Sequence, residues 1–219
     1  MADKFYFFSG SPNNPPGEGR CEKGDPTNYI ALSALGNWRK TLSSCYMAPF
    51  FWRGYTWNSV EHAFQAMKIG LQNHEKAYNF TVDSGHHIGQ GDGEHAHKHR
   101  KDVQLTKENI GTWAAKSASI MHDAATARYT QCAAAAEVLE ATGDAELWHV
   151  APRGRTYRFY HLESIRARRR AAARCAPVKP PKGDVVARKA REARAAARAA
   201  ASDERADEEG DAAFYVKYH

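Results

Sequence analysis

The sequence predicts one helix-rich folded domain with a few short strands, followed by a basic tail. Residues 57–71 carry apolar side chains at helical spacing, and the aromatic run of residues 4–8 has the composition of a buried strand. From residue 166 the composition changes to little more than Ala, Arg and Lys around a Pro-rich break. We therefore place the domain in residues 1–165 and a helical or disordered low-complexity tail in residues 166–219. With 219 residues, 42% of them hydrophobic, the chain can bury one sizeable core.

Short strands and loops are predicted ahead of the helix at residues 57–71. The aromatic strand ends at Ser9-Gly10, and residues 11–28 are rich in Pro, Gly, Asn and charge, which favours a surface loop. Residues 29–35 fit either a strand or a helical turn, because their periodicity does not decide. Residues 42–57 have an alternating pattern and carry aromatic side chains, with a turn at Arg53-Gly54. We therefore expect a hairpin that leads directly into the helix.

The helix at residues 57–71 is the segment around which we expect the domain to be organised. Its apolar residues recur every three or four positions and give it one buried face: Val60, Phe64, Met67 and Leu71. Its polar residues follow the same spacing and line a stripe beside that face: Glu61, Gln65 and Lys68. A carboxylate, an amide and an amine at the edge of a core suit a small polar substrate.

The spacing leaves two interpretations of Glu61. It follows Asn58 by three residues, as in a capping box, in which the carboxylate closes back on the helix N-terminus. Alternatively, an ionised carboxylate near a sugar carbon stabilises an oxocarbenium-like transition state or activates water. Lys68 lies two turns on, about 10 Å along the axis, so it does not pair with Glu61 but can reach the same ligand. Spacing alone favours a solvated lysine.

Further helices and a strand are predicted after this central helix. Residues 80–105 are rich in Gly and His, so we expect a loop that turns helical near Glu94. Thr106 caps a second helix, and a third runs from about 124 to 142 and stops at Gly143. The second helix takes its apolar face from Ile110, Trp113, Ile120 and Met121. The remaining elements are a returning strand at 147–150 and a closing helix at 161–166.

The histidines of the glycine-rich segment are candidate metal ligands, since imidazole commonly binds metals. They are His86, His87, His95, His97 and His99. The alternation of the last three suits a strand, the segment is rich in glycine, and no Cys or Glu is placed to complete a site. We therefore expect no metal and no cofactor.

The excess positive charge lies entirely in the tail. Residues 166–219 hold 14 Lys/Arg against 8 Asp/Glu, which is the whole net charge of +6, whereas residues 1–165 hold 17 of each. Clustered Arg and Lys attract phosphate backbones through counterion release, which predicts non-specific nucleic-acid contact by the tail. A solubilising low-complexity extension fits the same composition.

Neither a membrane segment nor a secretory signal is predicted. No window approaches the roughly 18 consecutive apolar residues of a membrane span, and the N-terminus lacks the basic-then-apolar order of a signal peptide. The cysteines are scattered without a CxxC pair and are expected to be free thiols: Cys21, Cys45, Cys132 and Cys175. We expect a soluble cytoplasmic protein, or a nuclear one in a eukaryote, without a membrane partner.

Several blocks of the sequence resemble the NADAR family, the YbiA-like N-glycosidases. They span most of residues 5–166 in the family's order: FYFFSG, LSSCYMAPFFWRGYTWNSVEHAFQAMK, GDGEHAHKHRKDVQLTKENIGTWAAK, and YTQCAAAAEVLEATGDAELWHVAPR followed by LESIR. The EHAFQAMK core and the later TGDAELWH are the specific motifs. The resemblance implies an α+β, helix-rich fold that hydrolyses an N-glycosidic bond.

The resemblance also implies roles for individual residues. Glu61 is similar to the family's catalytic acidic residue, and Lys68 to its lysine, which attacks the anomeric carbon and forms a Schiff base. Trp113 resembles a tryptophan that stacks on the substrate base, and Arg100 matches a position suited to phosphate. Gln65 and Ser44 lie in the matching motifs and are expected to bind substrate.

The chain departs from the family pattern at three places. Ser44 and Cys45 replace the usual Asn and aromatic residue, and His97 replaces the Arg of an Ala-Arg-Lys run. An Asp followed by Trp-Gly, common near the end of the domain, is replaced by a stretch beginning at Arg153. We expect removal of ADP-ribose from guanine in DNA. The alternatives are cleavage of ribosylamino-pyrimidine intermediates of riboflavin synthesis and an inactive ADP-ribose-binding module.

Overall fold

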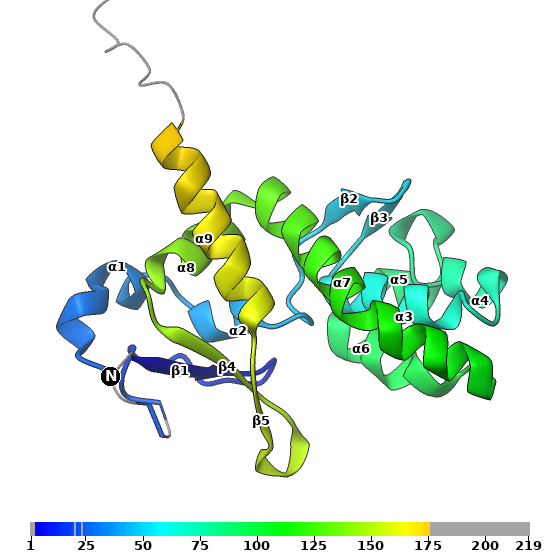
Figure 1. The fold of residues 1–219 in the computed structure, drawn as a ribbon, viewed down its shortest axis with the longest axis horizontal. Coiled ribbons are helices and arrows are strands. Elements are labelled where there is room, and N and C mark those ends of the chain that lie inside the picture. The colour runs from blue at the N-terminus through cyan, green and yellow to red at the C-terminus, as the bar shows by residue number, and fades with distance from the viewer. Residues whose placement is uncertain (1–2, 20, 23, 176–219) are drawn as a thin grey trace, which may run out of the picture. The chain divides into compact units, whose positions relative to one another are not determined.

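The computed structural model describes residues 3–19, 21–22 and 24–175. Helices and two small sheets make up this part of the chain, which is the mixed α+β, helix-rich class that the sequence predicts (Figure 1). The compact folded unit extends to Arg174. The predictions made for the tail beyond residue 175 lie outside the described residues.

A three-stranded sheet forms around the aromatic run. β1 (Lys4–Phe7) pairs in parallel with β4 (Glu146–Val150), and β4 pairs antiparallel with β5 (Thr156–Arg158). Phe5 lies opposite Leu147 in this register, and both side chains are fully buried. A parallel pair requires a long crossover, and here the crossover contains all the helices from α1 to α8. The predicted aromatic strand and returning strand are confirmed.

A buried ion pair fastens the Pro- and Gly-rich loop of residues 11–28 to the domain. Arg39 in α2 (Trp38–Leu42) has Nη2 2.6 Å from Oε2 of Glu22, and the two side chains are 3% and 0% exposed. Arg39 also donates to two loop carbonyls, while the Glu22 carboxylate accepts from three backbone N–H groups. The loop is largely exposed, as predicted, and a charge pair anchors it where apolar side chains are scarce.

Arg39→Met is expected to lower the free energy of unfolding by about 3–5 kcal/mol, because it leaves the Glu22 carboxylate buried without its partner. Methionine is flexible and adapts to the space left behind, so the loss reports mainly the charge. Urea denaturation measures the change. Lys40→Met, at a half-buried neighbouring lysine, is the control and should cost less than about 0.5 kcal/mol. Equal losses in both variants would contradict the anchoring role.

The predicted hairpin is present and leads into the central helix. β2 (Phe50–Trp52) and β3 (Tyr55–Trp57) pair antiparallel across Arg53-Gly54, whose φ angles of 52° and 85° lie in the left-handed region. Two consecutive positive φ angles are the backbone of a tight two-residue hairpin turn. Residues 29–35, for which the sequence allowed a strand or a helical turn, are helical in their first part. The helices here are η1 (Pro26–Tyr29) and α1 (Ile30–Ser33).

The central helix α3 (Val60–Ile69) is buried around most of its circumference. It packs against α4 (His74–Tyr78), α6 (Gly93–Lys98) and α7 (Lys107–Gln131). Its buried residues include several small and polar ones: Glu61, His62, Ala63, Gln65 and Ala66. Of the predicted apolar face only Val60 is fully buried. The prediction of a single buried face is therefore wrong, because neighbouring helices cover α3 on several sides.

Residues 80–105 form short helical turns rather than an open loop. These turns are η2 (Val82–Ser84), α5 (His87–Gln90), α6 and η3 (His99–Lys101). The helical start predicted near residue 94 is confirmed. Two glycines serve close packing, since a Cβ on Gly93 would lie 2.3 Å from Cα of Cys45, and one on Gly89 would meet backbone at 2.0 Å. The glycines that suggested a loop instead let α5 and α6 approach neighbouring backbone.

A single long helix replaces the second predicted helix and part of the third. α7 runs through the expected break between them, because residues 112–131 contain no Gly or Pro that would stop it. Its start after the Thr106 cap is as predicted. α8 (Ala133–Ala141) follows, and Gly143, with φ of 58°, terminates it as expected.

Two positions on α7 differ from its predicted apolar face. Ile110 is 54% exposed, whereas Arg128 is only 1% exposed. The Arg128 guanidinium donates to the carbonyls of Thr41 and Ser43, so it joins α7 to the segment that precedes β2. A buried arginine of this kind cannot be inferred from helical spacing, since the carbonyls to which it donates lie more than eighty positions away in the sequence.

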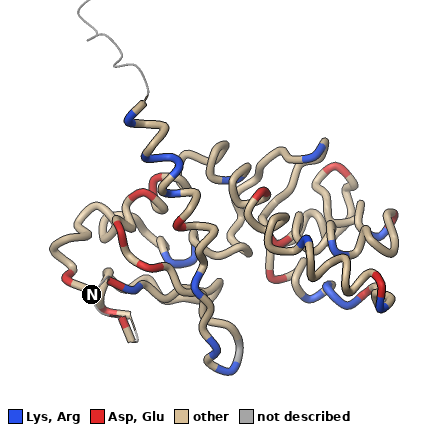
Figure 2. The backbone as a smooth tube through the Cα atoms, in the orientation of Figure 1, with Lys and Arg blue, Asp and Glu red and all other residues tan. Residues whose placement is uncertain are grey.

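The closing helix is longer than predicted. α9 (Tyr160–Cys175) runs past the expected domain boundary after Ile165, and Figure 2 shows the basic residues along it. Arg166 is buried and donates to groups just after α8, and Arg169 Nε lies 3.0 Å from the Glu140 carboxylate. The first arginines assigned to the tail therefore belong to the folded unit, because they find acceptors on α8 and the turn after it.

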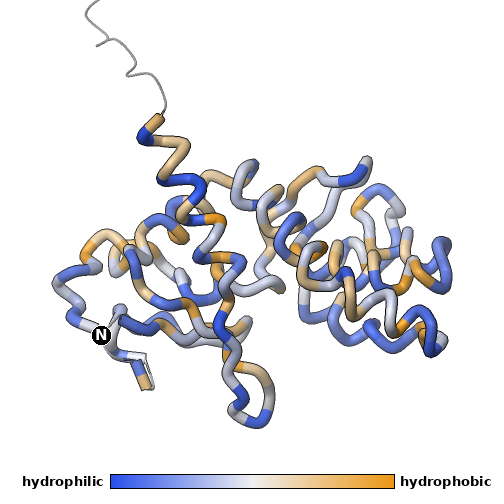
Figure 3. The backbone as a smooth tube through the Cα atoms, viewed as in Figure 1, coloured by the Kyte–Doolittle hydropathy of each residue, from blue (hydrophilic) through white to orange (hydrophobic). Residues whose placement is uncertain are grey.

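Within the described residues, no helix is both long enough and apolar enough to cross a membrane. Figure 3 shows hydrophilic residues recurring along α7 and α9, the two longest helices. Some apolar residues of these two helices pack into the core, whereas Ile110 on α7 and Tyr160 on α9 are exposed. The packed residues include Ala124 and Ala125 on α7, and Leu162 and Ile165 on α9.

Candidate active site

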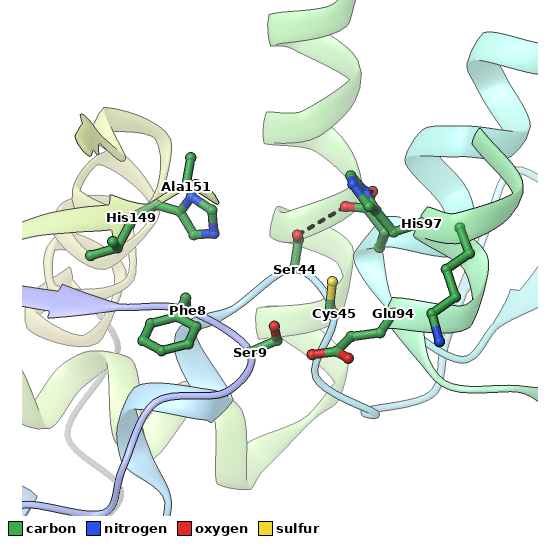
Figure 4. A pocket seen from close by; sticks show the side chains of 11 residues that line it. Phe8, Ser9, Ser44, Cys45, Glu94, His97, His149 and Ala151 are labelled. Carbon is green, nitrogen blue, oxygen red and sulfur yellow. Dashed lines mark hydrogen bonds and ion pairs between the residues drawn. The ribbon is translucent and has the colours of Figure 1, made fainter. Parts of the chain in front are cut away.

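A cavity of about 480 Å³ opens where β1 and β4 end. Its walls come from the chain after β1, the segment before β2, the helices α3 and α6, and the end of β4 (Figure 4). The residues that line it are Phe8, Ser9, Ser44, Cys45, Glu61, Glu94, His97, Lys98, His149, Val150 and Ala151. Because β1 and β4 are parallel, their carboxyl ends meet at one edge of the sheet, a common location for ligands.

Three side chains hold the Glu61 carboxylate at the wall of this cavity. Gln65 Nε2 donates to Oε1 at 2.8 Å, and His97 Nδ1 lies 2.7 Å from the same oxygen. Ser44 Oγ donates to Oε2 at 3.0 Å, the bond dashed in Figure 4. Glu61 is only 5% exposed. The carboxylate is thus fixed in position by hydrogen bonds from three different segments.

These hydrogen bonds decide the charge of Glu61. Burial alone would raise its pKa, because a carboxylate loses hydration inside a protein. The hydrogen bonds from His97, Gln65 and Ser44 outweigh burial and hold the pKa of Glu61 below its ordinary value. The N-terminal end of the α3 dipole favours the same ionised form. A carboxylate that stays ionised can stabilise positive charge or accept a proton from water.

The capping-box interpretation of Glu61 is wrong. The N-cap of α3 is Ser59, whose Oγ accepts from the backbone N–H of His62. Asn58 instead donates its side-chain amide to the carbonyl of Gly89 at 2.8 Å. The helix N-terminus is therefore completed by other groups, and the Glu61 carboxylate is left to face the cavity.

Aromatic rings form the wall at the strand ends, away from His97 in Figure 4. His149 stacks on Phe159 with 4.9 Å between ring centroids and meets Phe7 edge-on. Burial lowers the pKa of His149, opposed by the charge of Glu61, so its ring is neutral near pH 7. Phe8 is 39% exposed and borders the same cavity. This wall offers flat surfaces against which a nucleobase can stack.

Three residues of the site, His97, His149 and Phe8, were not predicted from the sequence. From the sequence, His97 was interpreted only as a departure from the family pattern and as a candidate metal ligand. Its contact with Glu61 joins residues 36 positions apart, and no local periodicity signals such a pair. His149 lies inside the TGDAELWH block, which was the one signal that pointed to it.

Only two of the six predicted site residues, Ser44 and Glu61, line this cavity. Lys68 Nζ donates to the carbonyl of Arg100 at 3.3 Å, and burial together with the charge of Arg100 lowers the pKa of Lys68. Arg100 Nη1 donates to the carbonyl of His97. Trp113 is half-buried and packs edge-on against Phe64, with ring centroids 4.8 Å apart. The other three predicted residues, Glu61, Gln65 and Ser44, are in mutual contact through the carboxylate.

Comparison with solved structures finds a likeness in fold. The chain is similar to the solution structure of the E. coli protein YbiA, with a TM-score of 0.48 and 18% sequence identity, over 81% of this chain and 91% of that one. No family model and no curated protein matches the sequence. At this identity and score the likeness says nothing about activity.

Proposed function

We propose that this protein is an N-glycosidase that removes ADP-ribose from nucleobases, with guanine in DNA as the leading substrate. The observation that carries the proposal is Glu61, an ionised carboxylate fixed by three hydrogen bonds at the wall of a cavity of about 480 Å³. The resemblance of EHAFQAMK and TGDAELWH to the NADAR motifs supports the reaction class.

Glu61 stabilises the positive charge that develops on the ribose during the reaction. Cleavage of an N-glycosidic bond builds positive charge on the anomeric carbon and the ring oxygen of the ribose. A carboxylate that is already ionised and oriented stabilises this charge without having to reorganise. The same oxygen atoms can accept a proton from an attacking water. His97 and Gln65 keep the carboxylate in place for either role.

Lys68 provides a covalent route to the same products. Its amine attacks the anomeric carbon as the bond to the base breaks, and the base leaves with a proton. The glycosylamine then opens at the bond between the anomeric carbon and the ring oxygen, which gives a Schiff base that water hydrolyses to free the sugar. The lowered pKa of Lys68 increases the fraction of neutral amine, which is the nucleophilic form. Nζ bonds to the Arg100 carbonyl in this conformation, so the side chain has to swing away from that carbonyl to reach a sugar beside Glu61.

Positive charge near α6 suits the diphosphate of the substrate. Lys98 lines the cavity, and Figure 2 shows basic residues gathered at the end of α6. Arg100 lies in η3 directly after it. A guanidinium can bind phosphate oxygens in a bidentate manner, whereas a lysine acts as a point charge. We assign Lys98 and Arg100 to the phosphates, and Trp113 to contact with the substrate base, as the family resemblance suggests.

The test compares two substrates with the purified 219-residue chain. One is an oligonucleotide carrying ADP-ribose on guanine, and the other is a free ribosylamino-pyrimidine. Chromatography measures the products of both reactions. We expect a higher kcat/KM for ADP-ribose release from the oligonucleotide than for cleavage of the ribosylamino-pyrimidine. Preference for the pyrimidine would move the function to the riboflavin-intermediate alternative. Thermal stabilisation by ADP-ribose without turnover of either substrate would indicate an inactive binding module.

The pH profile of this activity depends on the partners of Glu61. His97→Ala removes a hydrogen bond that lowers the pKa of Glu61, so that pKa rises and the carboxylate protonates at higher pH. The acidic limb of kcat/KM against pH is therefore expected to move upward. Ser44→Ala removes the bond to the other oxygen and is expected to move the limb in the same direction. An unchanged limb in both variants would contradict an ionised Glu61 as the required form.

A further inference from the structure

Three histidines meet outside the cavity that Glu61 lines. His87 in α5, His95 in α6 and His99 in η3 each present a ring nitrogen, and these nitrogens lie within 4.8 Å of one another. We propose that this histidine cluster binds a transition-metal ion, with Zn²⁺ as the leading candidate. None of the three residues lines the cavity at Glu61, so this is a separate site.

One pair of these nitrogens has a spacing close to that of a tetrahedral zinc site. His87 Nδ1 and His95 Nε2 are 3.1 Å apart. Two nitrogens bound to one tetrahedral zinc at about 2.0–2.1 Å lie roughly 3.3 Å from each other. The pair therefore has to separate only slightly. The hydrogen between the two rings has to move to the other nitrogen of its own ring, so that both lone pairs can face the ion. The three rings are mutually edge-on, with centroids 4.8, 5.3 and 5.5 Å apart.

Asp102 fixes the third imidazole. Its carboxylate accepts a hydrogen bond from His99 Nδ1 at 2.6 Å, which leaves Nε2 of that ring with a lone pair for a metal. A carboxylate behind a histidine ligand is the usual arrangement at zinc sites, because it sets the tautomer and makes the ligand more basic. A cavity of about 180 Å³ borders His87, His99 and Asp102. This space allows a water molecule to serve as the fourth ligand.

The helical backbone explains why the sequence alone argued against a metal. His95, His97 and His99 alternate along the chain, which fits a strand. In the structure α6 and η3 bring His95 and His99 together as an i, i+4 pair, the spacing found in helical zinc sites. His97 falls on a different face and meets Glu61. Neither Cys nor Glu is needed, because three imidazoles and one water complete a tetrahedral site.

The donor set selects the class of ion. Neutral imidazoles suit Zn²⁺, Co²⁺, Ni²⁺ and Cu²⁺, whereas Mg²⁺ and Ca²⁺ prefer oxygen ligands. A bound ion joins α5 to α6 and η3, three short elements that each contribute one ligand. Because α6 also carries His97, the ion steadies the helix that presents this residue to Glu61.

The experiment uses the 219-residue chain without a histidine tag, stripped of metal by a chelator. Co²⁺ is titrated while visible absorption is followed, and Zn²⁺ affinity is measured by competition with a chromophoric chelator. We expect one equivalent per chain with the intense visible bands of tetrahedral cobalt. His95→Gln and His99→Gln are each expected to weaken binding by more than about 100-fold, and Asp102→Asn by about 10- to 100-fold.

His74→Gln is the matched control, because His74 is exposed at the start of α4 and lies outside the histidine cluster. This variant should bind the ion as the unaltered chain does. Circular dichroism of every variant without metal checks that the fold is retained. Absence of stoichiometric binding in the unaltered chain would overturn the proposal. Equal affinity in the His74, His95 and His99 variants would overturn it as well.

Discussion

Glu61→Gln is expected to lower kcat/KM for ADP-ribose release from guanine-modified DNA by about 1,000-fold, a loss typical of removing an acid–base or charge-stabilising group. The substitution keeps the shape of the side chain and removes only its negative charge. The transition state then develops positive charge without an anion beside it. The rate of release under single-turnover conditions measures the effect on the chemical step directly.

The fold should survive this substitution, because each partner of Glu61 can adapt. The carbonyl oxygen of the new amide can accept from Gln65 and His97, as Oε1 does in Glu61. The new amide nitrogen can donate to Ser44 Oγ, since a hydroxyl both donates and accepts. Removing a buried charge also removes its desolvation cost. We therefore expect little change in the unfolding transition.

Glu75→Gln is the matched control for Glu61→Gln. Glu75 also stands in the first turn of a helix, α4, but it is exposed and does not line the cavity. The same chemical change at this position should leave the release rate within about twofold of the unaltered chain, since surface substitutions away from special features have small effects. Full activity in the Glu61 variant would remove the basis of the proposed mechanism.

Local chemistry allowed several elements of the fold to be predicted from the sequence. An aromatic run specifies β1, because such residues pack well in a buried strand. Arg53-Gly54 specifies the hairpin, Thr106 caps α7, and Gly143 ends α8. In each case the decisive interaction lies within a few residues of the signal. Such interactions can be read without knowing what packs against the element.

Contacts between distant residues could not be predicted in this way. The pair of Glu61 and His97 spans 36 positions, and Arg128 donates to carbonyls 85 and 87 positions away. Glu61 and His97 meet only when α3 and α6 have packed, and Arg128 reaches its acceptors only when α7 lies beside the end of α2. The boundary predicted after Ile165 was placed without knowledge of such contacts. The arginines that follow it look like a solvated tail until the turn after α8 supplies acceptors.

The candidate site was predictable in part for a related reason. Gln65 lies one helical turn from Glu61, so their contact follows from spacing. Ser44 came from the family motif and donates to the same carboxylate. His97 occupies a position where the family pattern has a different residue, so neither source pointed to its contact with Glu61. Residues that differ from a family pattern can thus become the partners of those that match it.

Reduction with sodium borohydride during turnover is expected to trap a covalent adduct between ADP-ribose and Lys68. A Schiff base between the amine and the anomeric carbon becomes a stable secondary amine on reduction, and intact-mass spectrometry detects the added ADP-ribose. Lys68→Met should abolish the adduct and lower turnover by about 100-fold or more, because the covalent route is lost. Lys76→Met is the control. Lys76 also donates a hydrogen bond from its ammonium group to a backbone carbonyl near η3, but its side chain is exposed.

The position of the trapped adduct decides between two lysines. Lys98 lines the cavity, whereas Lys68 lies outside its lining with Nζ on the Arg100 carbonyl. Position alone therefore favours Lys98. Reactivity favours Lys68, because burial and the charge of Arg100 lower its pKa and leave more of the neutral, nucleophilic amine. We expect peptide mapping to find the adduct on Lys68, which requires the side chain to leave the carbonyl when substrate binds. An adduct on Lys98, retained in Lys68→Met, would transfer the nucleophile to α6 and leave Glu61 as the catalytic group that both routes share.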